Sequence, residues 1–249
     1  MSKQVIELKR LLEEFEQKKN PSKAKILSGF FKTGKGEYGE GDIFLGLTVP
    51  QQRELAKKYV DLSLVDIQKL VDSKIHEYRL TGLIILTYQY EKISKEKIDE
   101  KEREKKKRII FDFYLLNTKN INNWDLVDLS SHEIIGQYLL NKNKEERKVL
   151  YKLVKSNHLW EKRIAMISTY AFIRNNDFKD TLAISEILLH DKHDLIHKAV
   201  GWMLREMGKR DEKTLKLFLD KHYKSMPRTA LRYSLERLSE KDKKNYMEK

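Results

Sequence analysis

Apolar residues recur at three- and four-residue spacing along nearly the whole chain, beginning with Val5, Leu8, Leu11, Leu12 and Phe15. This period places apolar side chains on one face of an α-helix. Strand-like alternation is nearly absent, and its best candidate is the short segment "DIFLGLTV" at residues 42–49. The pattern therefore predicts an all-α fold.

The three prolines support this interpretation, because each stands where a predicted helix would begin. Pro21 follows Asn20, Pro50 follows Val49 and Pro227 follows Met226. A proline at the start of a helix removes no hydrogen bond, since the first N–H groups have no partner within the helix.

A degenerate repeat organises these helices. Five segments share one pattern: residues 76–90, 122–136, 159–173, 194–208 and 225–239. When they are aligned, one position is occupied in turn by Arg79, Asp125, Arg163, Lys198 and Arg228. Such spacing is typical of stacked helix pairs of the HEAT or armadillo kind. We expect an α-solenoid of such pairs in a single domain of residues 1–249, because no interdomain linker interrupts the pattern.

The net charge of the chain indicates what kind of partner it binds. The 51 Lys and Arg residues against 38 Asp and Glu give a net charge of +13. This excess favours a polyanionic partner, most often nucleic acid. A general lysine bias in the source proteome is the alternative, and composition does not separate the two. The chain has no cysteine, which excludes disulfides, thiolate nucleophiles and cysteine-based zinc sites. It has no secretory signal pattern and no apolar run long enough for a bilayer, so we expect a cytoplasmic protein.

Two motifs imitate known sites. Gly34–Gly39 reads G-x-G-x-x-G, but the segment before it has a helical pattern and the segment after it adds acids and more glycine. We therefore expect a tight multi-turn loop and not a dinucleotide site. The spacing of His193 and His197 resembles a zinc-binding H-E-x-x-H box. Asp191 or Asp194 looks like a helix N-cap, and no third ligand is apparent, so we expect surface histidines and no metal.

Asp128 is the strongest candidate for chemistry. It lies four residues after Trp124, hence on the same helical face. The aligned repeats place Gly82, Met166, Gly201 and Leu231 at its position. A carboxylate that departs from the pattern of its own architecture indicates function. The alternative, an acid that meets the helix dipole, fits Asp125 better. Trp160 and Trp202 have Arg163 and Arg205 near them in the aligned helices, an arrangement that would suit a nucleic-acid groove.

The segments "NNWDLVD", "LWEKRIAMIS", "HKAVGWMLREMGKR" and "GEYGEGDIFLGLTVPQQR" together resemble the AlkD-like DNA alkylation repair family, from about Asn20 to Arg237. The resemblance implies a curved, right-handed α-solenoid that holds duplex DNA on a basic concave surface. It implies a monofunctional DNA glycosylase of base excision repair that hydrolyses the N-glycosidic bond of cationic N3- or N7-alkylated purines. A monomer without a cofactor is expected.

Carried over by motif, the catalytic carboxylate falls on Asp128, the aromatic walls on Trp124 and Trp202, and a DNA-contacting arginine on Arg163. Arg205, Lys198, Lys32 and Lys35 are further candidates for DNA contacts. The sequence also departs from the family pattern. Asn123 stands where some members have a second tryptophan, and the N-terminal aromatic contact maps loosely to Phe30 or Phe31.

Two other function classes stay open. One is a non-catalytic protein that binds DNA structures, and the other is a HEAT-type scaffold for protein interactions. The carboxylate between two aromatic residues favours the enzyme over the binder, and the basic excess favours both over the scaffold.

Overall fold

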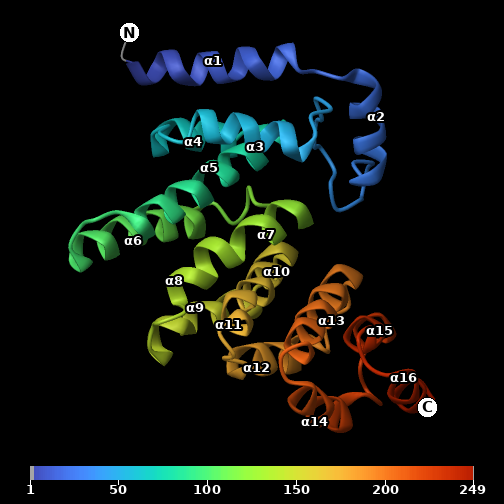
Figure 1. Cartoon of the computed structure of the whole chain (residues 1–249). Helices are drawn as coiled ribbons and strands as arrows, with labels where there is room; N and C mark the ends of the chain where they lie inside the picture. Colours follow the sequence, from blue (N-terminus) through green and yellow to red (C-terminus); the bar gives the residue numbers. More distant parts are fainter. Residues whose placement is uncertain (1–2, 249) are drawn as a thin grey trace. The chain divides into compact units, whose positions relative to one another are not determined.

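The structure is a computed structural model that describes residues 3–248 (Figure 1). Within that range the chain is helical, with no strand. A single parallel bridge joins Ile43 to Ile75. The predicted all-α fold is confirmed. The chain divides into two compact units between residues 130 and 131, and each is described separately. The single domain stays a prediction. No helix in residues 3–248 combines the length and apolar character needed to span a bilayer.

The first unit is built around one long helix, α5, which packs against α3, α4 and α6. Its elements are α1 (Lys3–Gln17), α2 (Pro21–Phe30), α3 (Val49–Lys58), α4 (Leu64–Val71), α5 (His76–Lys95), α6 (Glu100–Leu116) and the start of α7 (Trp124–Ser131). The central part of α5 is buried on nearly every side, from Arg79 to Leu86. This explains its apolar run, since a helix surrounded by others needs no polar face.

The second unit is centred on α13, which packs against α10, α12, α14 and α15. Its elements are a π-helical turn η1 (His132–Gly136), α8 (Gln137–Leu139), α9 (Lys144–Val154), α10 (Leu159–Ser168), α11 (Tyr170–Arg174), α12 (Lys179–Leu188), α13 (Asp194–Gly208), α14 (Glu212–His222), α15 (Arg228–Leu235) and α16 (Glu240–Met247). The adjacent helices η1, α10, α13 and α15 contact one another in that order. This is the neighbour-to-neighbour packing expected of helical repeats.

The repeated segments and the prolines are where the sequence predicted them. The five segments form α5, α7 with η1, α10 with α11, α13, and α15. Pro21 is the first residue of α2, Pro50 is the second of α3, and Pro227 caps the start of α15. The sequence period therefore located the helices, and the prolines marked three of their beginnings.

Candidate active site

A glycine-rich turn separates α2 from the segment that leads to α3. The amide of Gly39 donates to the carbonyl of Lys32 at 3.1 Å, so residues 32–39 close on themselves. Gly36 and Gly41 have φ values of 77° and 87°, a region that glycine adopts without strain. The tight turns that the glycines were predicted to serve are confirmed at these two positions.

The acids of this turn bind its own backbone. Oε2 of Glu37 accepts from the Gly34 amide at 2.9 Å, and Oε2 of Glu40 accepts from the Gly36 amide at 2.8 Å. A phosphate cradle would need such amides to point at its ligand. Here carboxylates already occupy them, which agrees with the expectation that the G-x-G-x-x-G string is not a dinucleotide site.

Asp42, at the end of the turn, belongs to a buried ion network. Its Oδ2 is 2.9 Å from Nδ1 of His76, and its Oδ1 accepts from Nη2 of Arg79 at 2.6 Å. The other ring nitrogen of His76, Nε2, lies 2.8 Å from Oδ2 of Asp125. Asn123 adds a long contact of 3.4 Å to Asp42. One imidazole on α5 thus joins the end of the glycine-rich segment to the first turn of α7, the helix that carries Trp124 and Asp128.

The charges in this network stabilise one another. Burial lowers the pKa of His76, but the carboxylates of Asp125 and Asp42 outweigh burial and raise it to about 9. Burial raises the pKa of Asp42, but His76 and Arg79 outweigh it, so that this pKa lies below its usual value. At neutral pH the site therefore contains an imidazolium between two carboxylates.

This network predicts how stability depends on pH. The pKa of His76 is raised in the folded protein above its ordinary value of 6.5, so its contribution is complete below pH 6.5 and disappears as the pH rises through 9. Between pH 6 and pH 10 we expect the free energy of unfolding to lose on the order of 3 kcal/mol from this group. Urea titrations across that range measure the loss. A His76→Gln variant with the same pH dependence as the wild type would contradict the assignment.

Four rings stack beside the ion network. Trp124 and Phe31 lie face to face with centroids 5.2 Å apart, Phe31 stacks on Phe44 at 5.1 Å, and Phe44 stacks on His76 at 4.6 Å. Phe30 meets Trp124 edge-on at 5.9 Å, and it is 61% exposed. The stack fixes the half-buried indole of Trp124 against the end of α2 and leaves Phe30 open to a ligand.

The segment between the turn and α3 is held by a side chain and not by a strand. Glu77 is buried, and its carboxylate accepts hydrogen bonds from the amides of Leu45, Gly46 and Leu47. The strand considered for residues 42–49 is wrong beyond the single bridge at Ile43. Apolar and polar residues do alternate here, but the backbone amides donate to the Glu77 carboxylate on α5 and not to a neighbouring strand.

Asp128 lies one turn after Trp124 on α7 and is half-buried. Its counterparts in the other repeats are all buried: Gly82, Met166, Gly201 and Leu231. The position therefore packs against neighbours in four repeats, and only in α7 does it carry a charge that reaches the surface. This difference supports the functional interpretation of Asp128.

The second unit carries Arg163 and Trp202. Arg163, on α10, is only 5% exposed, and its Nη1 donates to the carbonyl of Leu195 at 2.5 Å. Trp202, on α13, is half-buried, and its Nε1 donates to Glu206 at 3.2 Å. Trp160 is buried in the core. The indole of Trp202 is thus positioned at the surface, whereas Arg163 and Trp160 lie mainly among protein atoms.

The cations predicted to contact DNA differ in their surroundings. Arg205 pairs with Glu206 and Glu236, and Lys198 pairs with Asp194 at 2.9 Å. Lys32 and Lys35 are exposed on the glycine-rich turn. Lys32 lies 6.0 Å from the ring centre of Tyr38. A phosphate at Arg205 or Lys198 would have to compete with a carboxylate, which makes the two lysines on the turn the more accessible partners.

Sequence reasoning missed the partners of His76. Arg79 and Asp125 were aligned at one repeat position, and Asp42 was noticed only as an acid near the glycines. The available signal was the reversal of charge between adjacent repeats at that position, from Arg79 to Asp125. The two are linked indirectly, because His76 joins Asp125 to Asp42, and Asp42 in turn accepts from Arg79.

The histidine pair near α13 is part of a helix start. His193 itself is the N-cap, and its Nδ1 accepts from the amide of Leu195 at 3.1 Å. The prediction that Asp191 or Asp194 is the cap was wrong, because the imidazole takes that role. Nε2 of His197 contacts the carbonyl of Asp191 at 2.6 Å. Among the described residues, no three His, Asp or Glu side chains gather in an arrangement that could hold a metal ion.

Comparisons with known proteins agree with this architecture. The family model of DNA alkylation repair enzymes matches residues 11–238. A solved structure described as a predicted DNA alkylation repair enzyme from Enterococcus faecalis superposes with a TM-score of 0.68 at 16% identity, covering 89% of this chain and 97% of that one. That identity supports the fold alone. A search of curated proteins found no match. Because the family match extends over most of its length, the chain belongs to the family of DNA alkylation repair enzymes.

Proposed function

We propose that the protein hydrolyses the N-glycosidic bond of cationic N3- and N7-alkylated purines in duplex DNA. The observation that carries the proposal is the position of Asp128. It is a half-buried carboxylate one turn from a stacked indole, at a repeat position that is otherwise buried and uncharged. Because the chain belongs to a DNA alkylation repair family, we infer that the substrate of this carboxylate is alkylated DNA.

The chemistry needs few groups. An alkylated purine cation is already a good leaving group, so no strong general acid is required to protonate it. As the bond breaks, the sugar acquires oxocarbenium character, which a nearby negative charge stabilises. Asp128 would supply that charge and orient the water that attacks the sugar.

The tryptophans would act through their faces. An indole attracts positive charge on a sugar or base by cation–π interaction. Phe31 fixes the orientation of Trp124 by stacking on it. Glu206 fixes the orientation of Trp202 by accepting a hydrogen bond from the indole Nε1. Specificity would then come from the charge of the lesion, since a neutral base offers these faces no cation.

Arg163 is proposed to act as a positioning residue. The resemblance assigns it a phosphate contact, but its guanidinium is 5% exposed and bonds to the carbonyl of Leu195. Its bond to the carbonyl of Leu195 joins α10 to the first turn of α13.

The decisive experiment incubates the protein with duplex DNA that contains 7-methylguanine and measures the released base by chromatography. Release supports the proposal. Binding to this DNA without release would indicate the non-catalytic DNA binder, and neither binding nor release would indicate the protein-interaction scaffold.

A second prediction concerns Phe30. Replacing this exposed ring by alanine is expected to change the free energy of unfolding by less than about 0.5 kcal/mol. It is expected to weaken binding to alkylated duplex by about 1 kcal/mol, because the exposed ring beside Trp124 would lose the apolar area that it buries against the DNA. Ile26→Ala is the matched control, since Ile26 lies on the same helix and is 70% exposed. Equal affinities for the two variants would show that Phe30 does not contact the DNA.

A further inference from the structure

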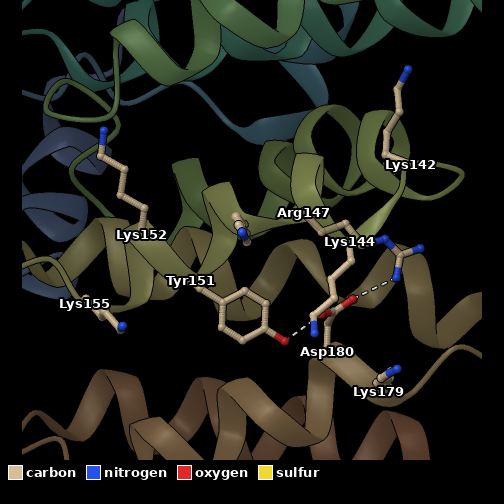
Figure 2. Close-up of a pocket in the computed structure, with 9 residues that line it drawn as sticks. Lys142, Lys144, Arg147, Tyr151, Lys152, Lys155, Lys179 and Asp180 are labelled. Carbon is tan, nitrogen blue, oxygen red and sulfur yellow. Dashed lines mark hydrogen bonds and ion pairs between the residues drawn. The ribbon is translucent and has the colours of Figure 1, made fainter.

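A second basic site lies between α9 and α12 in the second unit, at residues that the proposed reaction does not use (Figure 2). It is a cavity of about 700 Å³ that is lined by seven basic side chains and one carboxylate. Six of the seven are lysines: Lys142, Lys144, Lys148, Lys152, Lys155 and Lys179. We call this site the α9 pocket. So large an excess of one sign in one cavity points to an anionic ligand.

The single acid that lines the pocket is already hydrogen-bonded. Figure 2 shows Tyr151 and Arg147 converging on Asp180; the tyrosine hydroxyl donates at 2.7 Å and Nη1 of the arginine at 2.8 Å. Arg147 also pairs with Asp177 at 2.7 Å and lies 4.3 Å from the ring centre of Phe172. Arg147 and Asp180 thus form a structural base for the pocket, and the lysines above them provide its net charge.

Four of the six lysines have no acidic partner within residues 3–248. Lys148 lies 2.6 Å from Glu145, and Lys142 lies 3.7 Å from Glu146. The exposed amines of the other four have no carboxylate within 4.0 Å among the described residues: Lys144, Lys152, Lys155 and Lys179. This distinguishes them from Arg205 and Lys198, whose charges are matched. An unmatched amine can turn toward a ligand without breaking an ion pair.

The spacing of the lysines selects the kind of anion. Lys144, Lys148, Lys152 and Lys155 follow one another at four, four and three residues, so they share one face of α9. At 1.5 Å per residue this row is about 16 Å long. One strand of duplex DNA carries a phosphate about every 3.4 Å of axis, so a row of this length can reach several successive phosphates. A small phosphorylated molecule would engage only one end of it.

We propose that the α9 pocket binds the phosphodiester backbone of duplex DNA. The lysines would neutralise successive phosphates without reading the base sequence, as backbone contacts do. The proposal goes beyond base excision: α9 and α12 carry none of the residues assigned to the reaction, and the contact does not depend on Asp128.

The test measures how the affinity for an undamaged 30-base-pair duplex depends on salt. The triple variant Lys144→Gln, Lys152→Gln, Lys155→Gln is compared with the wild type in the full chain. Each neutralised phosphate contributes about 0.9 to the slope of log K against log salt. The slope of the variant is therefore expected to be shallower by about 2 to 3. Undamaged DNA makes the result independent of base release.

The matched control is Lys101→Gln, Lys105→Gln, Lys119→Gln, which removes the same charge from exposed lysines of the first unit. Equal slopes for the two triple variants would overturn the proposal, because the effect would then reflect net charge alone. The proposal would also be overturned, in favour of an acidic protein partner, if a poly-glutamate peptide bound as tightly as DNA and the triple variant lost that binding. Circular dichroism and thermal unfolding verify that both variants are folded.

Discussion

Replacing Asp128 with asparagine is expected to lower the rate of 7-methylguanine release about 100- to 1,000-fold. Asparagine keeps the size of the side chain but removes the negative charge that would stabilise the oxocarbenium-like sugar. It also replaces one acceptor oxygen with a donor group, so the attacking water would lose its orientation. Single-turnover kinetics with enzyme in excess isolates this step from DNA binding and product release.

Two measurements accompany this variant. The affinity for undamaged duplex is expected to stay within about twofold of the wild type, since Asp128 is proposed to act on the sugar of a lesion. The control is Asp61→Asn, which removes an equal charge from a side chain that is 74% exposed on the same unit. If Asp128→Asn retains the wild-type rate while the protein is active, the catalytic carboxylate lies elsewhere.

Replacing His76 with alanine is expected to destabilise the protein by about 3 to 5 kcal/mol, the usual cost of removing one partner from a buried ion pair. The carboxylates of Asp42 and Asp125 would face each other without the imidazolium that separates them. The stacking contact between the imidazole and Phe44 would also be lost. Urea unfolding at pH 7 measures the loss.

His190→Ala is the control for this variant, because His190 is exposed. Its effect is expected to lie within about 0.5 kcal/mol. A loss of less than 1 kcal/mol in His76→Ala would show that the first turn of α7 and the glycine-rich turn are held by other contacts. The variant is also expected to increase the mobility of Trp124, which the fluorescence anisotropy of the indoles would report against the same control.

Local patterns predicted much of the fold. The 3.6-residue period located α13 because this helix must bury one face against its neighbours, whereas α5 and α10, which are buried on more sides, were located by their place in the repeat. Pro21 and Pro50 marked helix starts because the first turn lacks internal acceptors for its amides. The neighbouring repeats also drew attention to Asp128, since a charged residue at an otherwise uncharged position departs from the pattern.

The environment of the site was not predictable in the same way. His76 binds Asp42 and Asp125, which are 34 and 49 residues away, and no period links such distant residues. The strand suggested at residues 42–49 was wrong for the same reason. The backbone amides of residues 45–47 donate to Glu77, a residue about 30 positions further along the chain. The burial of Arg163 depends on the carbonyl of Leu195, which a repeat alignment does not show.

The glycine-rich turn has a consequence for how relatives of this chain can differ in length. Its ends meet at the hydrogen bond between Gly39 and Lys32, and its internal acids bind only its own amides. The groups that fasten the chain to α5 begin after it, at Asp42 and at the amides of residues 45–47. Residues can therefore be inserted within 34–37 at a small entropic cost, while Phe31 and Trp124 remain stacked. Insertions there would then leave the surroundings of Trp124 in place but would displace Lys35.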